Sequence, residues 1–360
     1  MISNPENGKK HWTIHDIARQ AGVSAKTVSR VVNRESGVGE ATRAKVARII
    51  EKVGYHPHTG ARSMRSRPRD CIGVTISTPM NSVPITLDLF NFTFAELYQM
   101  FGSQGHHISF DLNPFSDNPR ADYARSLWEQ RCGGLVIIGP LTENDIIVPR
   151  VHASGHPYVV QSRLDSLPEC SHATVDYEEG AFISTRYLTQ RGHRHIGMLK
   201  GFHGFNSGLE RLRGYRRALE EADMHFDTSL VHPVGFGSRD IVAAVHRLLL
   251  DPAVTAVIDC SAAEDAASIR EGARRAGRVT GKDFEVVAWT YTDNAAILAE
   301  AAAHVWLPVI EAAREGFKAF AKWYSGECNE PVHVLYRPTL YETSSLPVVP
   351  KPQRLFDILT

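Results

Sequence analysis

Apolar residues near the start of the chain recur at helical spacing in three short segments, 13–21, 24–33 and 40–53. Gly22 follows the first segment and Gly54 follows the third, and a glycine is the usual residue just past a helix end. The pattern therefore predicts three short helices. Only Gly22 and Val23 separate the first two, and such a pair of helices is typical of a helix-turn-helix.

The second predicted helix has one apolar and one polar face. Ser24 is a good N-cap residue, and valines form the apolar stripe. The polar face carries hydrogen-bonding and cationic side chains, namely Lys26, Thr27, Ser29, Arg30 and Asn33. Such groups on a helix N-terminus suit phosphates and base edges in a major groove. Taken alone, the stretch fits an ordinary amphipathic surface helix equally well.

The distribution of charge along the chain favours the first interpretation. The formal net charge of the 360 residues is zero, which by itself would argue against a nucleic-acid partner. Residues 1–69, however, contain 14 Lys and Arg against 5 Asp and Glu, a net charge of +9. The remaining residues contain 26 against 35, a net charge of −9. A basic N-terminal module on an acidic body is the asymmetry expected of a nucleic-acid binder.

From Cys71 onward, strand-like and helix-like segments alternate, which indicates parallel sheets covered by helices. Two such series in succession predict two lobes with a ligand cleft at the carboxyl ends of the strands. The first series has strands at 72–76, 107–110, 134–138 and 158–160. The second has strands at 173–175, 196–199, 256–258 and 285–289, and includes a helix at 307–324.

Several classes of protein are disfavoured. The five cysteines are scattered and odd in number, which fits a reducing compartment rather than a disulfide framework or a zinc site. Residues 1–12 resemble a flexible basic arm without an apolar signal segment, and no apolar run could cross a bilayer. We therefore expect a cytoplasmic protein that does not contact a membrane.

No catalytic or metal-binding constellation is recognisable either. Gly201 and Gly204 lack the other residues of a phosphate loop, and His193 with His195 is no ligand set by itself. No serine or cysteine has an identifiable base partner. We expect no enzymatic activity, no cofactor and no metal.

The run TIHDIARQAGVSAKTVSRVVN, followed by ATRAKVARIIEKVGYHP and ARSM, closely resembles the start of LacI/GalR-family transcriptional regulators. The match is nearly gapless from Thr13 to Met64, and weaker similarity continues to about Ser345. It implies a small all-α helix-turn-helix headpiece joined by a hinge to a two-lobed α/β effector domain of the periplasmic-binding-protein-like type I, with parallel sheets. The implied divisions are the arm 1–12, the headpiece 13–56, the hinge helix and linker 57–69, the effector-binding and dimerisation domain 70–345 with crossovers near 173, 303 and 331, and the tail 346–360.

The resemblance places DNA contacts in the headpiece and hinge. We expect Ala25 and Lys26 to read base edges of double-stranded operator DNA. Met64 occupies the position from which relatives insert a leucine into the minor groove. The composition of the hinge segment also fits a solvated linker. One headpiece reads half of a palindrome, so a homodimer is expected. The full set of DNA-binding candidates is Thr13, Ser24, Ala25, Lys26, Thr27, Ser29, Arg30, Asn33, Tyr55, Arg62 and Met64.

Arg211 is the main candidate for holding a small-molecule effector, because it matches the arginine that reaches the effector in this family. A solvated surface charge is the alternative. Phe236 matches an aromatic residue that stacks on sugars in some relatives, or belongs to the core; Ser77 faces the cleft or caps a turn. The effector candidates are Ser77, Ser162, Arg163, Arg211, Phe236 and Thr290.

The resemblance implies a carbohydrate-like effector, that is, a sugar, a sugar acid or a sugar phosphate. Ser162 and Thr290 stand where sugar-binding relatives usually have aspartates, whereas Arg211 is kept. This favours an effector with an anionic group. Alternatively, Asp259, Asp265 or Asp293 supplies the carboxylate and the effector is a neutral sugar.

The function predicted from the sequence is that of a ligand-responsive, dimeric transcriptional repressor. The alternative is a cytoplasmic sugar-binding or sugar-processing protein in which the headpiece is incidental.

Overall fold

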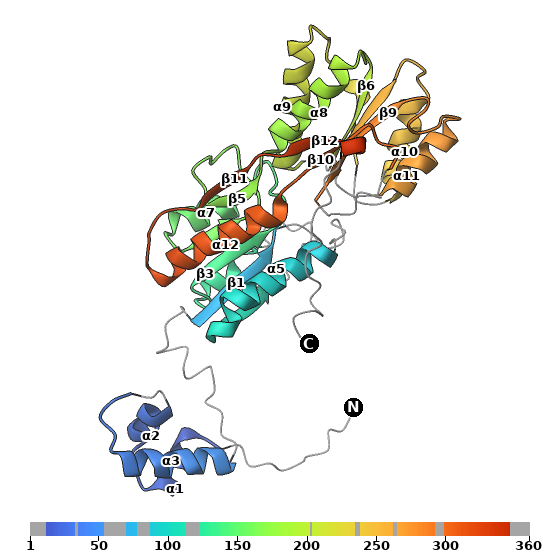
Figure 1. Cartoon of the computed structure of the whole chain (residues 1–360). Helices are drawn as coiled ribbons and strands as arrows, with labels where there is room; N and C mark the ends of the chain where they lie inside the picture. The colour runs from blue at the N-terminus through green and yellow to red at the C-terminus, as the bar shows by residue number, and fades with distance from the viewer. Residues whose placement is uncertain are drawn as a thin grey trace, which may run out of the picture. The chain divides into compact units, whose positions relative to one another are not determined.

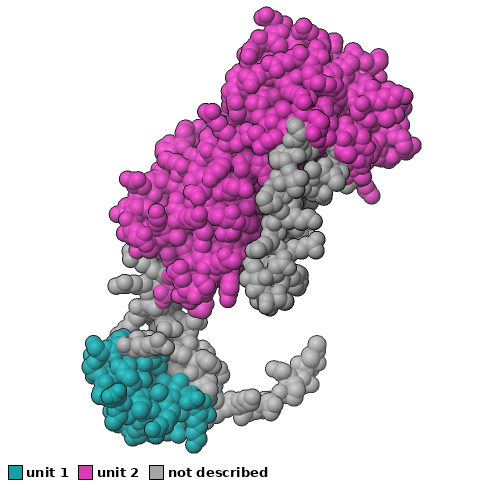
Figure 2. Space-filling view, in the orientation of Figure 1, with its two compact units in different colours: residues 1–67 teal, residues 68–360 magenta. Residues whose placement is uncertain are grey.

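The computed structural model describes residues 12–32, 35–53, 70–77, 87–111, 122–201, 204–234, 238–261, 265–291 and 299–345. The chain divides into two compact units, residues 1–67 and residues 68–360, which Figure 2 colours teal and magenta.

The first unit contains the three predicted helices, α1 (Ile14–Ala21), α2 (Ala25–Val32) and α3 (Glu40–Val53). Gly22 ends α1 in the left-handed conformation, with φ of 67°, and its N–H donates to carbonyls of the last turn. The helices bury one small core made of Ile17, Ala18, Ala21, Val28, Val31 and Val46. The apolar stripes read from the sequence therefore face one another, and the predicted helix-turn-helix is confirmed.

The second unit contains two six-stranded sheets. The first has the order β11-β5-β4-β3-β1-β2 and the second the order β12-β10-β9-β8-β6-β7. Within the described residues, neighbouring strands of both sheets pair in parallel, except β10 with β12. The strands of the first sheet are β1 (Cys71–Ile76), β2 (His107–Asp111), β3 (Gly134–Ile138), β4 (Tyr158–Val160), β5 (His172–Val175) and β11 (His333–Tyr336). Those of the second are β6 (Ile196–Gly201), β7 (Val231–Pro233), β8 (Ala256–Asp259), β9 (Glu285–Thr290), β10 (Ala303–Trp306) and β12 (Thr339–Glu342).

Helices cover both faces of each sheet (Figure 1). We call each sheet with its helices a lobe. The first lobe has α5 (Leu87–Met100), α6 (Arg125–Trp128), α7 (Ile147–Ala153) and α12 (Val309–Ser325). The second lobe has α8 (Tyr177–Gln190), α9 (Asn206–Glu221), α10 (Ser238–Leu249) and α11 (Ala266–Arg275). Short 3-10 turns occur at Gly102–Gln104, Thr228–Leu230 and Thr343–Ser345.

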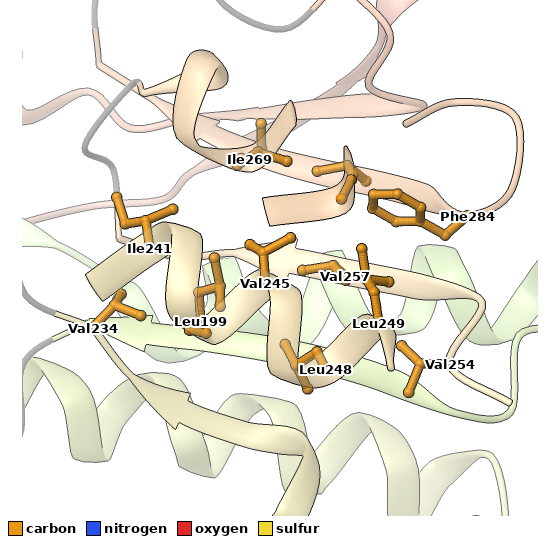
Figure 3. Close-up of a cluster of buried hydrophobic side chains, with 14 of the residues drawn as sticks. Leu199, Val234, Ile241, Val245, Leu248, Leu249, Val254, Val257, Ile269 and Phe284 are labelled. Carbon is orange, nitrogen blue, oxygen red and sulfur yellow. The ribbon is translucent and has the colours of Figure 1, made fainter. Parts of the chain in front are cut away.

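The core of each lobe lies between its sheet and these helices. Figure 3 shows one such cluster, in which Ile241, Val245 and Leu248 of α10 pack toward Leu199 and Val257 of the sheet. The alternation of strand and helix segments along the sequence corresponds to these parallel sheets, in which each strand is buried under helices. The predicted two-lobed fold is confirmed.

Two elements belong to a different lobe from the one expected. The segment 173–175 was predicted to begin the second series, but β5 pairs with β4 and β11 and completes the first sheet. The helix predicted at 307–324 was also assigned to the second series. In the structure, Phe317 and Phe320 of α12 pack against the first sheet. An apolar strand or an amphipathic helix carries no local information about which sheet it joins.

None of the helices in the described ranges is both long enough and apolar enough to span a bilayer.

Candidate functional site

The first turns of α1 and α2 are fixed by side-chain caps. Thr13 and Asp16 form a reciprocal capping box: the Asp16 N–H donates to Thr13 Oγ1 at 3.3 Å, and the Thr13 N–H donates to the Asp16 carboxylate at 3.0 Å. Ser24 Oγ accepts from the Thr27 N–H at 3.1 Å, and the two hydroxyls lie 2.9 Å apart. The N-terminal turn of α2 is therefore held in one geometry by residues of the helix itself.

The two faces of α2 are arranged as the sequence predicted. Val28 and Val31 are buried, whereas Lys26 is exposed and Ser29 and Arg30 are half-buried. Ala25 packs partly against the core of the headpiece, so its surface is less available than that of Lys26. Asn33, Tyr55, Arg62 and Met64 lie outside the described residues, as does the effector candidate Phe236.

In the second unit, the effector candidates lie at the carboxyl ends of strands from both sheets. Ser77 follows β1, Ser162 follows β4, and Thr290 ends β9; all three are buried. Ser77 has a structural use, because its hydroxyl reaches the carbonyls of Ile138 at 3.3 Å and Pro140 at 3.1 Å. It thereby ties the end of β1 to the end of β3.

Arg163 is already neutralised by acids of the second lobe. Its Nε donates to Glu210 at 3.0 Å, and its guanidinium lies 3.6 Å from Asp176. Glu210 is 2% exposed, and this burial raises the pKa of its carboxyl, an effect that Arg163 opposes. Arg163 thus serves as an ion-pair partner between the lobes in this structure.

Arg211, the next residue of α9, has a different environment. It is 9% exposed, and its Nη1 donates to the Lys200 carbonyl at 3.1 Å. Within the described residues, its buried Nε has no hydrogen-bond acceptor and no carboxylate lies within ion-pairing distance. We call this side of the guanidinium the open edge of Arg211.

Two aromatic rings hold Arg211 from the side. Its guanidinium carbon is 4.9 Å from the Tyr177 ring centroid and 5.3 Å from that of Trp289. The two rings are nearly parallel, with an interplanar angle of 11°, and the Trp289 indole donates to Ser184 at 3.0 Å. The arrangement places the Arg211 cation against two aromatic faces, while its buried Nε has no acceptor within the described residues.

Of the three aspartates that the sequence offered as the carboxylate for a neutral sugar, Asp259 lies near Arg211. Asp259, at the end of β8, is buried and accepts from the Ser261 N–H at 3.0 Å and from its hydroxyl at 2.5 Å. Burial raises the pKa of Asp259, while Ser261 and the nearby Arg211 oppose the rise. Asp265 instead caps α11 through Ser268, and Asp293 lies outside the described residues.

Sequence reasoning missed three residues of this region. Tyr177 and Trp289 read as ordinary apolar positions of a helix start and a strand. Gln161 directly follows β4, and its buried Nε2 has no acceptor within the described residues. Gln161 could have been found from its position, because it is a polar residue between an apolar strand and the candidate Ser162.

Two family models match the chain. Residues 13–58 match the bacterial regulatory proteins of the lacI family, and residues 99–315 match the periplasmic binding proteins and sugar binding domain of the LacI family. The chain belongs to the LacI family. This LacI-family regulator is 30% identical over 333 residues to the HTH-type transcriptional regulator CelR of Thermobifida fusca, covering 91% of this chain and 96% of CelR.

Solved structures agree with this membership. A complex of the transcriptional regulator CelR with cellobiose has 27% identity and a TM-score of 0.62, covering 92% of this chain and 98% of CelR. The Lac repressor dimer bound to operator and the anti-inducer ONPF has the same fold, with 20% identity and a TM-score of 0.72, covering 94% and 100%. The matched proteins are transcriptional regulators, so the prediction of a non-enzymatic transcriptional regulator is confirmed.

Proposed function

We propose that this LacI-family regulator is a repressor that binds a palindromic operator as a dimer. In this proposal, a small carbohydrate-like effector in the cleft changes its affinity for DNA. The observation that carries the ligand response is the open edge of Arg211, a buried cation without a carboxylate partner in the described residues. An unpaired buried charge is costly, and a ligand acceptor would remove that cost.

The operator half of the proposal is supported by α2. Its capped first turn presents Lys26, which can donate to guanine O6 and N7 in a major groove. Because one such helix covers a half-site, a palindrome needs two copies. We propose that the two copies contact each other through Phe94 of α5 and Phe110 of the edge strand β2. The ring centroids of these two residues lie 4.5 Å apart, and both side chains are more than a third exposed. We call this pair the Phe94–Phe110 edge.

The effector is proposed to carry an anionic group, as in a sugar acid or sugar phosphate. Arg211 Nη1 is occupied by the Lys200 carbonyl, so the Nε side of the guanidinium remains for a bidentate contact. Burial raises the pKa of the nearby Asp259 carboxyl, although its hydrogen bonds from Ser261 and the charge of Arg211 oppose the rise. The competing possibility is a neutral sugar whose hydroxyl donates to ionised Asp259.

The DNA-reading assignment is tested by selecting operator DNA from a random pool with the full-length protein. Lys26→Ala should change the selected bases, since a base contact contributes about 1–3 kcal/mol of discrimination. Lys45, an exposed lysine of α3, provides the matched control, and Lys45→Ala should keep the original preference. An unchanged selected sequence for Lys26→Ala would refute the assignment.

Met64→Ala tests the proposal that the Met64 side chain inserts into the minor groove. This substitution should weaken binding to the selected operator, measured at one fixed salt concentration.

The ligand assignment is tested by calorimetry with neutral sugars, sugar acids and sugar phosphates. Arg211→Lys should weaken binding of the anionic class at least about tenfold, because a lysine cannot form the bidentate contact. Arg270→Lys, on the exposed face of α11, should leave binding unchanged. Tight binding of a neutral sugar that Arg211→Lys does not weaken would end the anionic proposal.

A further inference from the structure

The backbones of the two lobes hydrogen-bond directly to each other. The Glu143 N–H donates to the Gly204 carbonyl at 3.1 Å, and the Asn206 N–H donates to the Leu141 carbonyl at 3.0 Å. Asn206 is the first residue of α9, and its N–H therefore has no acceptor within the helix. The carbonyl of the other lobe supplies that acceptor.

Side chains extend this contact on the same side. The Asp165 N–H donates to Asn206 Oδ1 at 3.3 Å, and Asn206 Nδ2 donates back to Asp165 at 3.2 Å. Arg213, two turns along α9, forms an ion pair with Asp165 at 2.5 Å, and both side chains are a little over 40% exposed. Asp165 of the first lobe therefore binds both Asn206 and Arg213 of the second lobe.

The ion pair between Arg163 and Glu210 is the buried part of the same contact. The Glu210 carboxylate accepts from Arg163 at 3.0 Å and lies within 3.4 Å of Asn206 Nδ2. Glu210 is 2% exposed, so in this arrangement water does not screen its attraction to Arg163 as it screens an exposed pair. Separating the lobes would break this contact together with the hydrogen bond to Asn206.

We propose that residues 141–143 and 163–165 of the first lobe and 204–213 of the second form an inter-lobe latch. The latch holds the two lobes together on this side, and the lobes must break it to separate. Glu210 of the latch and Arg211 of the cleft are consecutive in α9, so a ligand drawn to Arg211 acts on the helix that carries the latch. This last step deepens the proposed function, whereas the latch itself needs no ligand.

Amide hydrogen exchange of the full-length protein at single-residue resolution tests the latch directly. The amides of Glu143 and Asn206 are protected by hydrogen bonds between lobes, so their exchange reports lobe separation. Asp165→Ala should accelerate the exchange of both amides roughly tenfold, because it removes one exposed ion pair and the other hydrogen bonds of the Asp165 carboxylate. Arg213→Met should act in the same direction with a smaller factor.

Glu300→Gln is the matched control, because the Arg270–Glu300 pair has similar exposure but lies within one lobe. It should leave both amides at the wild-type rate. The Ser77 amide, bonded within the first lobe, and the Val234 amide, bonded within the second, should stay unchanged in every variant.

Three results would overturn the latch. These are unchanged exchange at Glu143 and Asn206 in Asp165→Ala, an equal acceleration in Glu300→Gln, and an equal acceleration of the Ser77 and Val234 amides. Since no ligand or DNA is added, this outcome is independent of whether the protein is a repressor with an anionic effector.

Discussion

The stability of the protein should depend strongly on the charge of Glu210 and hardly at all on that of the next residue of α9, Arg211. Glu210 is buried and satisfied, because it accepts from Arg163 and lies next to Asn206. Arg211 is buried and only partly satisfied, because its open edge meets no acceptor in the described residues. We predict that Glu210→Gln destabilises the protein, whereas Arg211→Met leaves the free energy of unfolding nearly unchanged.

The magnitudes follow from the contacts. Arg211→Met removes a charge-assisted bond to the Lys200 carbonyl, about 1.5–3 kcal/mol, but also removes the penalty of a buried donor without a partner, about 1–3 kcal/mol. The lost cation–π contact, about 0.5–2 kcal/mol, is partly replaced by sulfur–aromatic contact of about 0.3–1.5 kcal/mol. The net change should be within about 1 kcal/mol of zero. Glu210→Gln should cost about 2 kcal/mol, less than the usual 3–5 for a broken buried pair because Arg163 retains Asp176.

Urea unfolding of the full-length variants measures both changes at once. The midpoint of the transition of residues 68–360 should fall for Glu210→Gln and stay near wild type for Arg211→Met, at an unchanged slope. Arg270→Met, at an exposed ion pair, should also leave the midpoint unchanged. If Arg211→Met lowered the midpoint as far as Glu210→Gln, Arg211 would be a structural cation and the reasoning from its open edge would fail.

Three further predictions concern other parts of the body. Gly214→Ala should destabilise it by about 1–3 kcal/mol in urea unfolding, because a methyl group there would collide with the backbone of α8, where Gly214 allows close approach. Burial lowers the pKa of His172 and His304. The unfolded chain therefore binds more protons below about pH 6.5, and the urea midpoint should fall between pH 7 and pH 5, less steeply in His304→Gln. Phe110→Lys should shift the protein toward monomer in analytical ultracentrifugation, whereas an unchanged distribution would remove the Phe94–Phe110 edge from the proposed dimer contact.

The helices of the headpiece could be predicted closely, because their positions and caps depend on residues that are near one another in the sequence. Val28 and Val31 repeat at helical intervals, Gly22 follows a helix end, and the Thr13–Asp16 box lies within one turn. Ala25 is only partly exposed, because it also packs against the core of the headpiece. Partial burial depends on neighbours that a helical repeat does not reveal.

The assignment of elements to lobes failed where partners are distant in sequence. β5 joins β11 across about 160 residues, since His172 pairs with His333, and α12 returns to the sheet that β1 began. A short apolar strand reads the same in either sheet. The same limit applies to Arg163, whose partner Glu210 is 47 residues away and whose charge therefore looked available to a ligand.

The geometry of α9 explains how a ligand at Arg211 would reach the contact between the lobes. Asn206, Glu210 and Arg213 are spaced by four and three residues, so they form one stripe, and each of the three contacts the first lobe. Arg211 follows Glu210 by about 100° around the helix and contacts Tyr177 instead. Because the three latch contacts lie along one helix, a shift of α9 away from the first lobe by about 1 Å would lengthen hydrogen bonds of 3.0–3.3 Å beyond useful range in all three contacts together.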